Sequence, residues 1–298
     1  MKQQTKELVQ IQKKLVDEIL TNPDRLEKLI DIQLASRKGF HNYSARNLLL
    51  ADYQLRTRTG EGIELLAGYK KWQKGIKVDN KKIHRHVKKG EKALKILIPY
   101  TYTTNDVDPK TGEEIKKTHT YFKLGNVFDV SQTEGDALEV DFTRTNKNYT
   151  LEEIINRGKV QVNLSNKELT RGYTNGKEIW ISKHISTPRQ ICTYFHELAH
   201  YLLHFDNNRN ELDTPTKELE AEAVSFIVSY YIGIENEESS AYIHNWNKNK
   251  TNEEKLELLK GKGSNVLKTA TKIINDLKLD ELLDSTVETG NVDIGVVA

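Results

Sequence analysis

The chain has 298 residues, a formal net charge of +2 at pH 7, 30% charged residues and 37% hydrophobic residues. This length favours two domains, and the single cysteine, Cys192, excludes an internal disulfide and fits a reducing compartment. The first residues lack the apolar segment of a signal peptide, and no apolar run approaches the length of a membrane span. We therefore expect a cytoplasmic protein with no membrane partner.

The small net charge hides an uneven distribution along the chain. Residues 1–130 carry 26 Lys and Arg against 16 Asp and Glu, a net charge of +10. Residues 131–298 carry 19 against 27, a net charge of −8. Opposite signs in the two halves suggest two separate tasks, and the basic half requires an anionic partner.

The first half predicts an α+β domain with N-terminal helices followed by a small antiparallel sheet. Apolar residues at helical spacing indicate one or two amphipathic helices and then a further helix, and alternating residues indicate strands after them. The predicted elements are helices at 5–36 and 42–55, strands at 93–102, 117–124 and 126–130, and a turn at 108–112.

Basic and aromatic residues are interleaved in this half, which is the pattern that single-stranded nucleic acid needs. Cations follow the phosphates, and aromatic rings stack on unpaired bases. The aromatic residues are Tyr43, Tyr69, Trp72, Tyr100, Tyr102, Tyr121 and Phe122. The residues expected to contact nucleic acid are Lys70, Lys71, Trp72, Lys88, Lys89, Lys92 and Tyr121. Composition alone leaves the alternative open, because surface lysines are usually solvated and strand aromatics usually belong to the core.

The second half predicts a hairpin followed by a long helix. Residues 172–182 contain an Asn-Gly turn and then an alternating strand, which in a metallopeptidase lies at a cleft edge and pairs with an extended peptide. An ordinary hairpin explains the pattern equally well. Thr187–Gln190 forms a capping-box pattern with Pro188 at the first helical position, and apolar residues at helical spacing follow it.

This helix carries the motif His196-Glu197-Leu198-Ala199-His200. Histidines four residues apart lie on one helix face, so both imidazoles can bind one metal ion. Glu197 is placed to take a proton from the attacking water, as in zinc hydrolases. The motif favours Zn²⁺, with another divalent ion such as Mn²⁺ as the alternative. The competing interpretation is a core helix that carries two histidines by chance.

A catalytic zinc takes three protein ligands, and a second helix that begins near Lys217 is expected to supply the third. Glu218 and Glu222 lie one turn apart on the same helix face, and Glu220 points elsewhere. Glu222 is the predicted ligand because it lies beside the buried stripe, with Glu218 orienting a ligand histidine. His204 is about 12 Å along the axis from His196, too far to share the ion, and is expected to be a helix-end or supporting residue. A solvated acidic face is the alternative for the glutamates.

Taken together, the chain resembles the ArdC antirestriction family. The matching segments are Asn47–Leu50, Tyr69–Trp72, Val87–Lys92, Tyr121–Gly135, His196–His200 with His204, Glu218–Glu222, and Tyr242–Trp246. The resemblance implies a single-stranded-DNA-binding domain joined to a zincin-like α+β metallopeptidase domain, in a protein carried by conjugative plasmids and related mobile elements. It also implies His196, His200 and Glu222 as metal ligands and Glu197 as the general base.

One segment departs from the family pattern. Tyr201-Leu202-Leu203 stands where the family often has Trp-Thr-Gly, and this apolar version is similar to ImmA/IrrE-type peptidases, which cleave transcriptional regulators. The leading hypothesis is a DNA-binding antirestriction or accessory protein with a zinc metallopeptidase-like domain. The alternatives are a cytoplasmic peptidase that cleaves a DNA-associated regulator, and a binding module with an inert metal site. The partners expected are single-stranded DNA and a protein or peptide substrate.

These features predict four segments. Residues 1–135 form the DNA-binding domain, residues 136–148 a linker, residues 149–280 the metallopeptidase domain and residues 281–298 a flexible tail.

Overall fold

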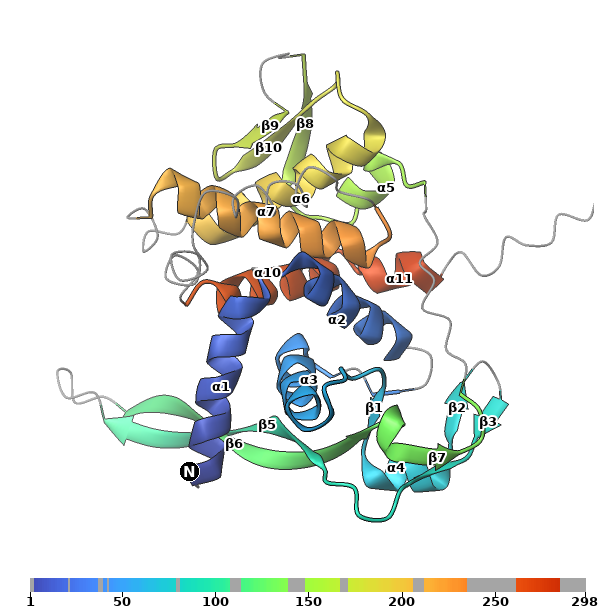
Figure 1. Cartoon of the computed structure of the whole chain (residues 1–298). Coiled ribbons are helices and arrows are strands. Elements are labelled where there is room, and N and C mark those ends of the chain that lie inside the picture. The colour runs from blue at the N-terminus through green and yellow to red at the C-terminus, as the bar shows by residue number, and fades with distance from the viewer. Residues whose placement is uncertain are drawn as a thin grey trace, which may run out of the picture. The chain divides into compact units, whose positions relative to one another are not determined.

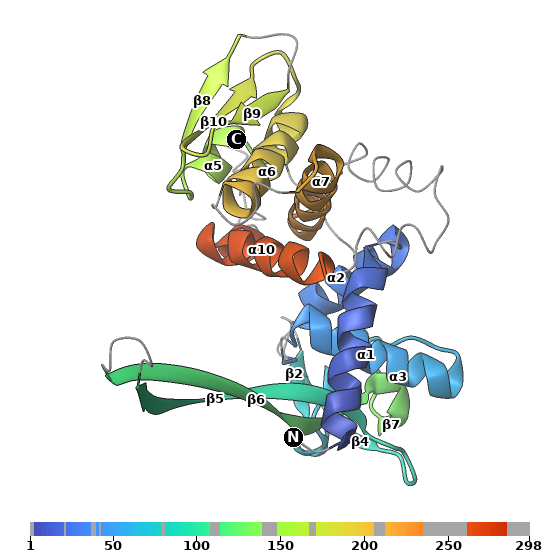
Figure 2. The ribbon, with the colours of Figure 1, turned by 90° about the vertical axis from the view of Figure 1, so that its left-hand side faces the viewer.

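The computed structural model describes residues 3–20, 22–36, 40–41, 43–78, 81–107, 114–138, 148–166, 171–205, 212–234 and 261–284. The chain has the predicted α+β composition, with helices and small sheets in both halves (Figures 1 and 2). It divides into two compact units, one of residues 1–16 with 31–142 and the other of residues 17–30 with 143–298. The domain boundaries drawn from the sequence stay a prediction.

The first helices agree with the sequence analysis in place but differ at their ends. The segment 5–36 forms two helices, α1 (Gln3–Ile19) and α2 (Pro23–Ser36). Helix α3 (Ala45–Thr59) begins after Ser44, whose hydroxyl accepts a hydrogen bond from the backbone N–H of Asn47. It continues past the predicted end at residue 55 and stops at Gly60. The φ of Gly60 is 83°, a left-handed conformation that glycine adopts easily and that commonly ends a helix.

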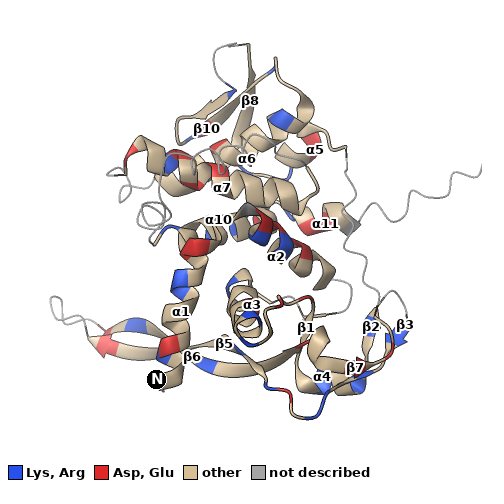
Figure 3. Cartoon of the chain, viewed as in Figure 1, with Lys and Arg blue, Asp and Glu red and all other residues tan. Residues whose placement is uncertain are grey.

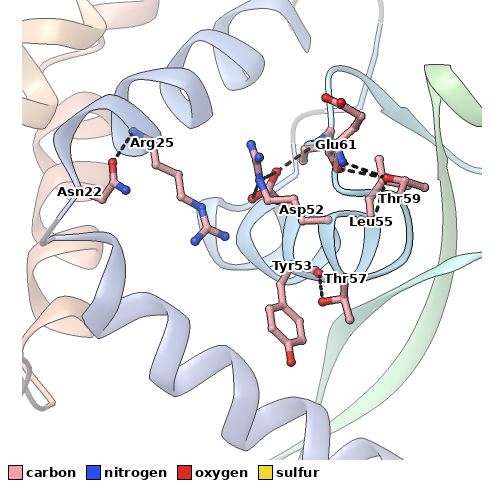
Figure 4. Close-up of polar contacts among 10 residues, drawn as sticks. Asn22, Arg25, Asp52, Tyr53, Leu55, Thr57, Thr59 and Glu61 are labelled. Carbon is pink, nitrogen blue, oxygen red and sulfur yellow. Dashed lines mark hydrogen bonds and ion pairs between the residues drawn. The ribbon is translucent and has the colours of Figure 1, made fainter.

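Side-chain hydrogen bonds hold the last turns of α3 (Figure 4). Thr57 and Thr59 donate from their hydroxyls to the carbonyl oxygens of Tyr53 and Leu55, at 2.7 and 3.0 Å. The carboxylate of Asp52 is buried and accepts the N–H of Ile63 at 3.2 Å, so the end of the helix is tied to the segment that leads into β1 (Leu66–Ala67). A buried carboxylate is tolerated because such bonds replace water.

A long antiparallel ribbon dominates the sheet of the first unit. Strands β5 (Leu94–Val107) and β6 (Glu114–Asp129) pair along their whole length, and β1 (Leu66–Ala67) adds to the other edge of β6. The predicted break between strands 117–124 and 126–130 is wrong, because β6 runs through Gly125. A Cβ at this position would lie 2.9 Å from Ile96 Cγ1 and 2.8 Å from Ile98 Cδ1, so glycine lets the partner strand pack closely. The predicted turn at 108–112 lies outside the described residues.

Short elements complete the first unit around a compact core. They are α4 (Tyr69–Lys74), β2 (Ile76–Val78), β3 (Lys81–Ile83), β4 (Arg85–Val87), a 3-10 turn at Val130–Gln132 and β7 (Thr133–Gly135). Trp72 is 1% exposed, packs edge-on against Phe40 and donates its indole N–H to the carbonyl oxygen of Phe128 at 3.1 Å. This bond satisfies the one polar group of a buried tryptophan.

The second unit contains a small mixed sheet. Its strands are β8 (Gln161–Ser165), β9 (Gly172–Thr174) and β10 (Glu178–Ser182), in the order β8-β10-β9, with β8 parallel and β9 antiparallel to β10. The predicted hairpin is confirmed: Gly176 has a φ of 80°, and Asn175 accepts the N–H of Lys177 at 2.9 Å. Helix α5 (Leu151–Ile155) precedes the sheet.

Two long helices follow, α6 (Thr187–His204) and α7 (Thr214–Tyr231), which pack on each other. The predicted capping box of α6 does not form. Ser186 is the N-cap, and Gln190 instead donates its amide to the carbonyl oxygen of Ser182. Helix α7 begins three residues before Lys217, because Asp213 caps it by accepting the N–H of Thr216 at 3.1 Å.

Helices α10 (Gly263–Asp276) and α11 (Leu279–Asp284) close the second unit. The carboxylate of Asp17 accepts the backbone N–H groups of Gly261 and Gly263, so a negative charge lies at the first turn of α10, where the helix dipole favours it. In the described parts of the chain, no helix combines the length and the apolar character that a bilayer span requires.

Candidate metal centre and nucleic-acid surface

Helix α6 presents three histidines along one face. His196, His200 and His204 follow one another at intervals of four residues, and successive ring centroids are 4.7 and 4.9 Å apart. The buried face of the same helix holds Ile191, Tyr194, Phe195 and Ala199, each 0% exposed. The apolar stripe therefore fixes the rotation of α6 and, with it, the direction in which the histidines project.

The first two rings converge on one carboxylate from α7. The Nε2 atoms of His196 and His200 lie 3.0 Å apart. Glu218 places Oε2 at 3.3 Å from Nε2 of His196 and Oε1 at 3.4 Å from Nε2 of His200. One ligand atom from each of these three residues lies within 4.8 Å of the others. Two imidazoles and a carboxylate form the donor set of zinc hydrolases, so these residues fit a divalent cation.

Glu222 lies on the other side of the first ring. Its Oε1 is 3.4 Å from Nδ1 of His196, the nitrogen opposite the one that faces Glu218. The structure thus brings together all four residues that the sequence predicts for the centre: His196, His200, Glu222 and, beside them, Glu197. Glu218, expected only to orient a histidine, is the carboxylate that faces both Nε2 atoms.

A buried pair lies behind the second ring. His204 Nδ1 is 2.8 Å from His200 Nδ1, and its Nε2 is 3.1 Å from Oε2 of Glu220. The side chains of His204 and Glu220 are only 3% and 0% exposed. The sequence predicts that Glu220 points away from the site, and the Glu-rich start of α7 gives no signal that this glutamate is buried. Glu220 pairs with the buried ring of His204, which in turn contacts His200.

The charges around His196 favour a cation. Burial on its own would lower the pKa of His196, but hydrogen bonds with Glu218 and Glu222 and the charge of Glu197 raise it to about 10. Hydrogen bonds from both histidines lower the pKa of Glu218 in turn. The site therefore stabilises positive charge between its carboxylates, which is what a metal site requires.

Glu197 differs from the other carboxylates of the centre. It is 7% exposed, and burial raises the pKa of its carboxyl group, while the charges of His196 and His200 oppose the rise. Strand β9 reaches it closely: a Cβ on Gly172 would lie 3.2 Å from Cγ of Glu197 and 2.5 Å from Cγ2 of Thr193. Glycine at this position lets the edge strand of the sheet approach the carboxylate that is suited to accept a proton.

The residues expected to contact nucleic acid fall into two groups in the first unit. Lys70 and Lys71 on α4, and Lys88, Lys89 and Lys92 in the segment between β4 and β5, are exposed. Trp72 belongs to the core described above, so its ring faces are not available to a base. We therefore leave Trp72 out of the proposed surface.

Tyr121 is exposed and belongs to a row of rings, the aromatic face, formed by Tyr100, Tyr102, His119 and Tyr121 on β5 and β6. Tyr100 stacks on Tyr121 at 5.6 Å between centroids, and Tyr102 on His119 at 5.2 Å. Lys123 Nζ lies 4.2 Å from the centroid of Tyr100. The alternation of Tyr100 and Tyr102 was visible in the sequence, but only the strand pairing shows that these rings share a face.

Comparison with known proteins bears on both units. Residues 159–253 match the family of the IrrE N-terminal-like domain, Peptidase_M78. This segment contains β8, β9, β10, α6 and α7. An uncharacterized protein of Bacillus anthracis is 26% identical over 324 aligned residues, covering 91% of this chain and 52% of the relative. The chain thus spans about half the length of this curated relative.

Two solved structures are similar to the chain. The antirestriction ArdC protein from plasmid R388, in its metal-free form, is 20% identical with a TM-score of 0.46, over 86% of this chain and 96% of that one. Its Mn(II)-bound form is 16% identical with a TM-score of 0.43, over 89% and 99%. Of the two units, the second therefore contains the segment that resembles a peptidase family, the IrrE N-terminal-like domain at residues 159–253.

Proposed function

We propose that the chain is an antirestriction or accessory protein of a mobile element, with a metallopeptidase-type centre in its second unit and a single-stranded-DNA surface in its first. The observation that carries the proposal is the convergence of His196 Nε2, His200 Nε2 and the Glu218 carboxylate. The match of residues 159–253 to a peptidase family supports it independently.

For the metal ligands we propose His196, His200 and Glu218, with Zn²⁺ as the ion and Mn²⁺ as the alternative. Glu222 holds Nδ1 of His196 and fixes the ring, because an imidazole that binds metal through one nitrogen usually donates its other N–H to an oxygen. This assignment exchanges the roles that the sequence predicts for Glu218 and Glu222.

A divalent cation held there supplies Lewis-acid polarisation of a peptide carbonyl and makes water a better nucleophile. Glu197 accepts the proton from the attacking water and delivers it to the leaving amine. Its burial suits this role, because a raised pKa brings a carboxyl group closer to neutral pH, where it exchanges a proton most effectively. Strand β9 offers backbone hydrogen bonds to an extended peptide beside Glu197.

For the first unit we propose that single-stranded DNA lies along the aromatic face. Tyr100, Tyr102 and Tyr121 are 41%, 50% and 38% exposed, an unusual degree for rings on a paired strand. Lysines on β5 and β6 lie along the same ribbon, and further lysines lie on α4 and near β3 (Figure 3). Exposed rings with nearby cations provide base stacking and phosphate neutralisation together.

A second candidate function follows from the apolar segment Tyr201-Leu202-Leu203 and the match to the IrrE N-terminal-like domain. In this case the second unit cleaves a DNA-associated regulator, and the first unit brings it to DNA. The two functions require the same centre, and they differ in whether protection of DNA survives loss of Glu197.

The proposal is tested by metal analysis of the purified full chain and of His196→Ala. We expect close to one equivalent of divalent metal in the wild-type protein and its loss in the variant. His184→Ala is the matched control, because His184 is exposed and lies outside α6. A wild-type protein that takes up no Zn²⁺ or Mn²⁺, or a His196→Ala variant that binds metal as well as wild type, would contradict the proposal.

A further inference from the structure

A cavity of about 610 Å³ lies in the first unit, apart from the metal centre. Gln12 of α1 contributes to it, together with Tyr43 and Arg46 at the start of α3 and with Ile96, Ile98 and Phe122 of the ribbon. Apolar surface predominates in the walls, and polar side chains, among them those of His41, Arg46 and Asn126, also line the cavity. Sites of this kind hold flat organic ligands, whose orientation the polar groups decide.

Tyr43 contributes a phenol hydroxyl to the lining of the cavity. The residue is 8% exposed, and no hydrogen bond joins its hydroxyl to another described residue. The ring of His41 packs edge-on against it at 4.5 Å. Burial raises the pKa of Tyr43 to about 12, so the hydroxyl keeps its proton at neutral pH. A protonated phenol hydroxyl can donate one hydrogen bond to a ligand in the cavity and accept others.

Hydrogen bonds to the backbone hold two other polar side chains of the cavity, those of Asn47 and Gln12. Asn47 donates to the carbonyl oxygen of Leu97 and accepts its N–H, both at 3.0 Å. Gln12 donates its amide to the carbonyl oxygen of Arg46 at 3.2 Å, which leaves its own carbonyl oxygen as an acceptor. The cavity therefore offers a preformed donor and a preformed acceptor between apolar walls.

One wall of the cavity, formed by Ile96 and Ile98, lies in line with the aromatic face. Residues two apart on a strand project to the same side, so Ile96 and Ile98 lie in line with Tyr100 and Tyr102. Ile98 is 38% exposed and pairs with Lys123, and Ile96 pairs with Gly125, where the absence of a side chain leaves room. A strand of nucleic acid that stacks on Tyr102 and Tyr100 therefore reaches the cavity if it continues along β5 past Ile98.

We propose that the cavity takes up one unpaired nucleobase, whose polar edge bonds with the Tyr43 hydroxyl and the Gln12 carbonyl while its faces contact the apolar walls. The inference rests on the proposed DNA binding of the first unit and adds a base-reading pocket to a surface that otherwise stacks without sequence preference. Stacking accepts every base, whereas hydrogen bonds to a base edge distinguish among bases.

The test uses the full chain and Tyr43→Phe, which keeps the ring and its contact with His41. Affinity is measured for 20-nucleotide homopolymers of dT, dC and dA and for a 20-unit abasic strand. We expect the variant to lose about threefold to tenfold in affinity for the best homopolymer, to bind the three bases more equally, and to bind the abasic strand as wild type does. Tyr53→Phe is the matched control, because Tyr53 lies on α3 outside the cavity.

Other variants separate this inference from the proposed function. If Tyr100→Ala weakens binding but Tyr43→Phe changes nothing, or lowers affinity for all strands including the abasic one equally, the pocket is refuted and the aromatic face stands. If no strand binds, the pocket is tested by titration with the four deoxynucleosides, in which NMR follows the shifts of the protein signals. Signals that shift in wild type and not in Tyr43→Phe support the pocket, and the absence of any shift overturns it.

Discussion

The metal centre lies on two packed helices, whereas the aromatic face lies along two paired strands that are open to solvent. In the centre, the side chains of His196 and His200 are 16% and 14% exposed, and each ring is held from two sides by carboxylates or by another imidazole. On the aromatic face, the rings touch one another and Lys123 but remain accessible. The first arrangement suits a small ion held in fixed positions, and the second suits a long flexible ligand.

This difference predicts how each site responds to substitution. A centre whose members hold one another loses function steeply when one of them is removed, because the remaining charges are left unpaired. A face of repeated, similar contacts loses affinity in small steps, because each ring contributes separately.

The largest expected effect is that of Glu197→Gln on peptide hydrolysis. Removal of the group that accepts and returns the proton should lower the rate about 100-fold to 10,000-fold, while metal content is retained because Glu197 is not a ligand in our assignment. The measurement is hydrolysis of a peptide library by mass spectrometry, with metal content determined on the same samples. Equal rates in the variant and wild type would remove Glu197 from the proton transfer.

Protection of DNA from a restriction enzyme should be measured with the same variant. Persistence of protection in Glu197→Gln favours the antirestriction role of the first unit, and its loss favours a function that depends on cleavage.

The next effect concerns the pair behind His200. Glu220→Gln leaves His204 without its charged partner, so His200 is held less firmly. We expect the affinity for Zn²⁺ to fall about 10-fold to 100-fold. Competition with a chromophoric chelator provides the measurement. Asp276→Asn serves as the control, since Asp276 is exposed on α10 and pairs with Lys272. Unchanged affinity in Glu220→Gln would show that the pair serves packing only.

Removal of a single ring from the aromatic face is expected to have a moderate effect. Tyr100→Ala deletes one stacking position and should weaken binding of oligo-dT by about 1–3 kcal/mol. Fluorescence anisotropy of a labelled strand measures it. A Tyr53→Ala variant should bind normally, and identical affinities for Tyr100→Ala and wild type would place the strand elsewhere.

The smallest effect should come from a single surface cation. Lys89→Ala is expected to reduce the slope of log affinity against log salt concentration by about one, with little change in base preference. Lys268→Ala on α10 of the second unit is the matched control. A slope that changes equally in both variants would indicate a general effect of net charge.

The sequence anticipated the proximity of the candidate metal ligands better than that of the aromatic rings, and the reason is geometric. A spacing of four residues places His196 and His200 together on any α-helix, whatever the rest of the fold does. Glu218 and Glu222 also share a face, but their roles depend on how α7 is shifted along α6. Only the packed helices show that Glu218 meets Nε2 and Glu222 meets Nδ1.

Strand alternation is weaker evidence because it does not say which strands pair or which side is covered. Gly125 suggested a break between two strands, yet it permits one continuous strand against Ile96 and Ile98. Trp72 lies among lysines in the sequence, but its ring belongs to the core, because short amphipathic helices carry both kinds of residue within one turn. The cavity beside Tyr43 combines α1, the start of α3 and both strands of the ribbon, so no local pattern reveals it.

The most direct test of the account is the Zn²⁺ affinity of Glu218→Gln compared with that of Glu222→Gln, measured side by side in the full chain. If Glu218 joins His196 and His200 as a ligand, its variant should lose more affinity than Glu222→Gln, whose loss should stay near the 10-fold to 100-fold typical of a residue that orients a ligand. A Glu218→Gln variant that binds Zn²⁺ as tightly as wild type would contradict the proposed centre.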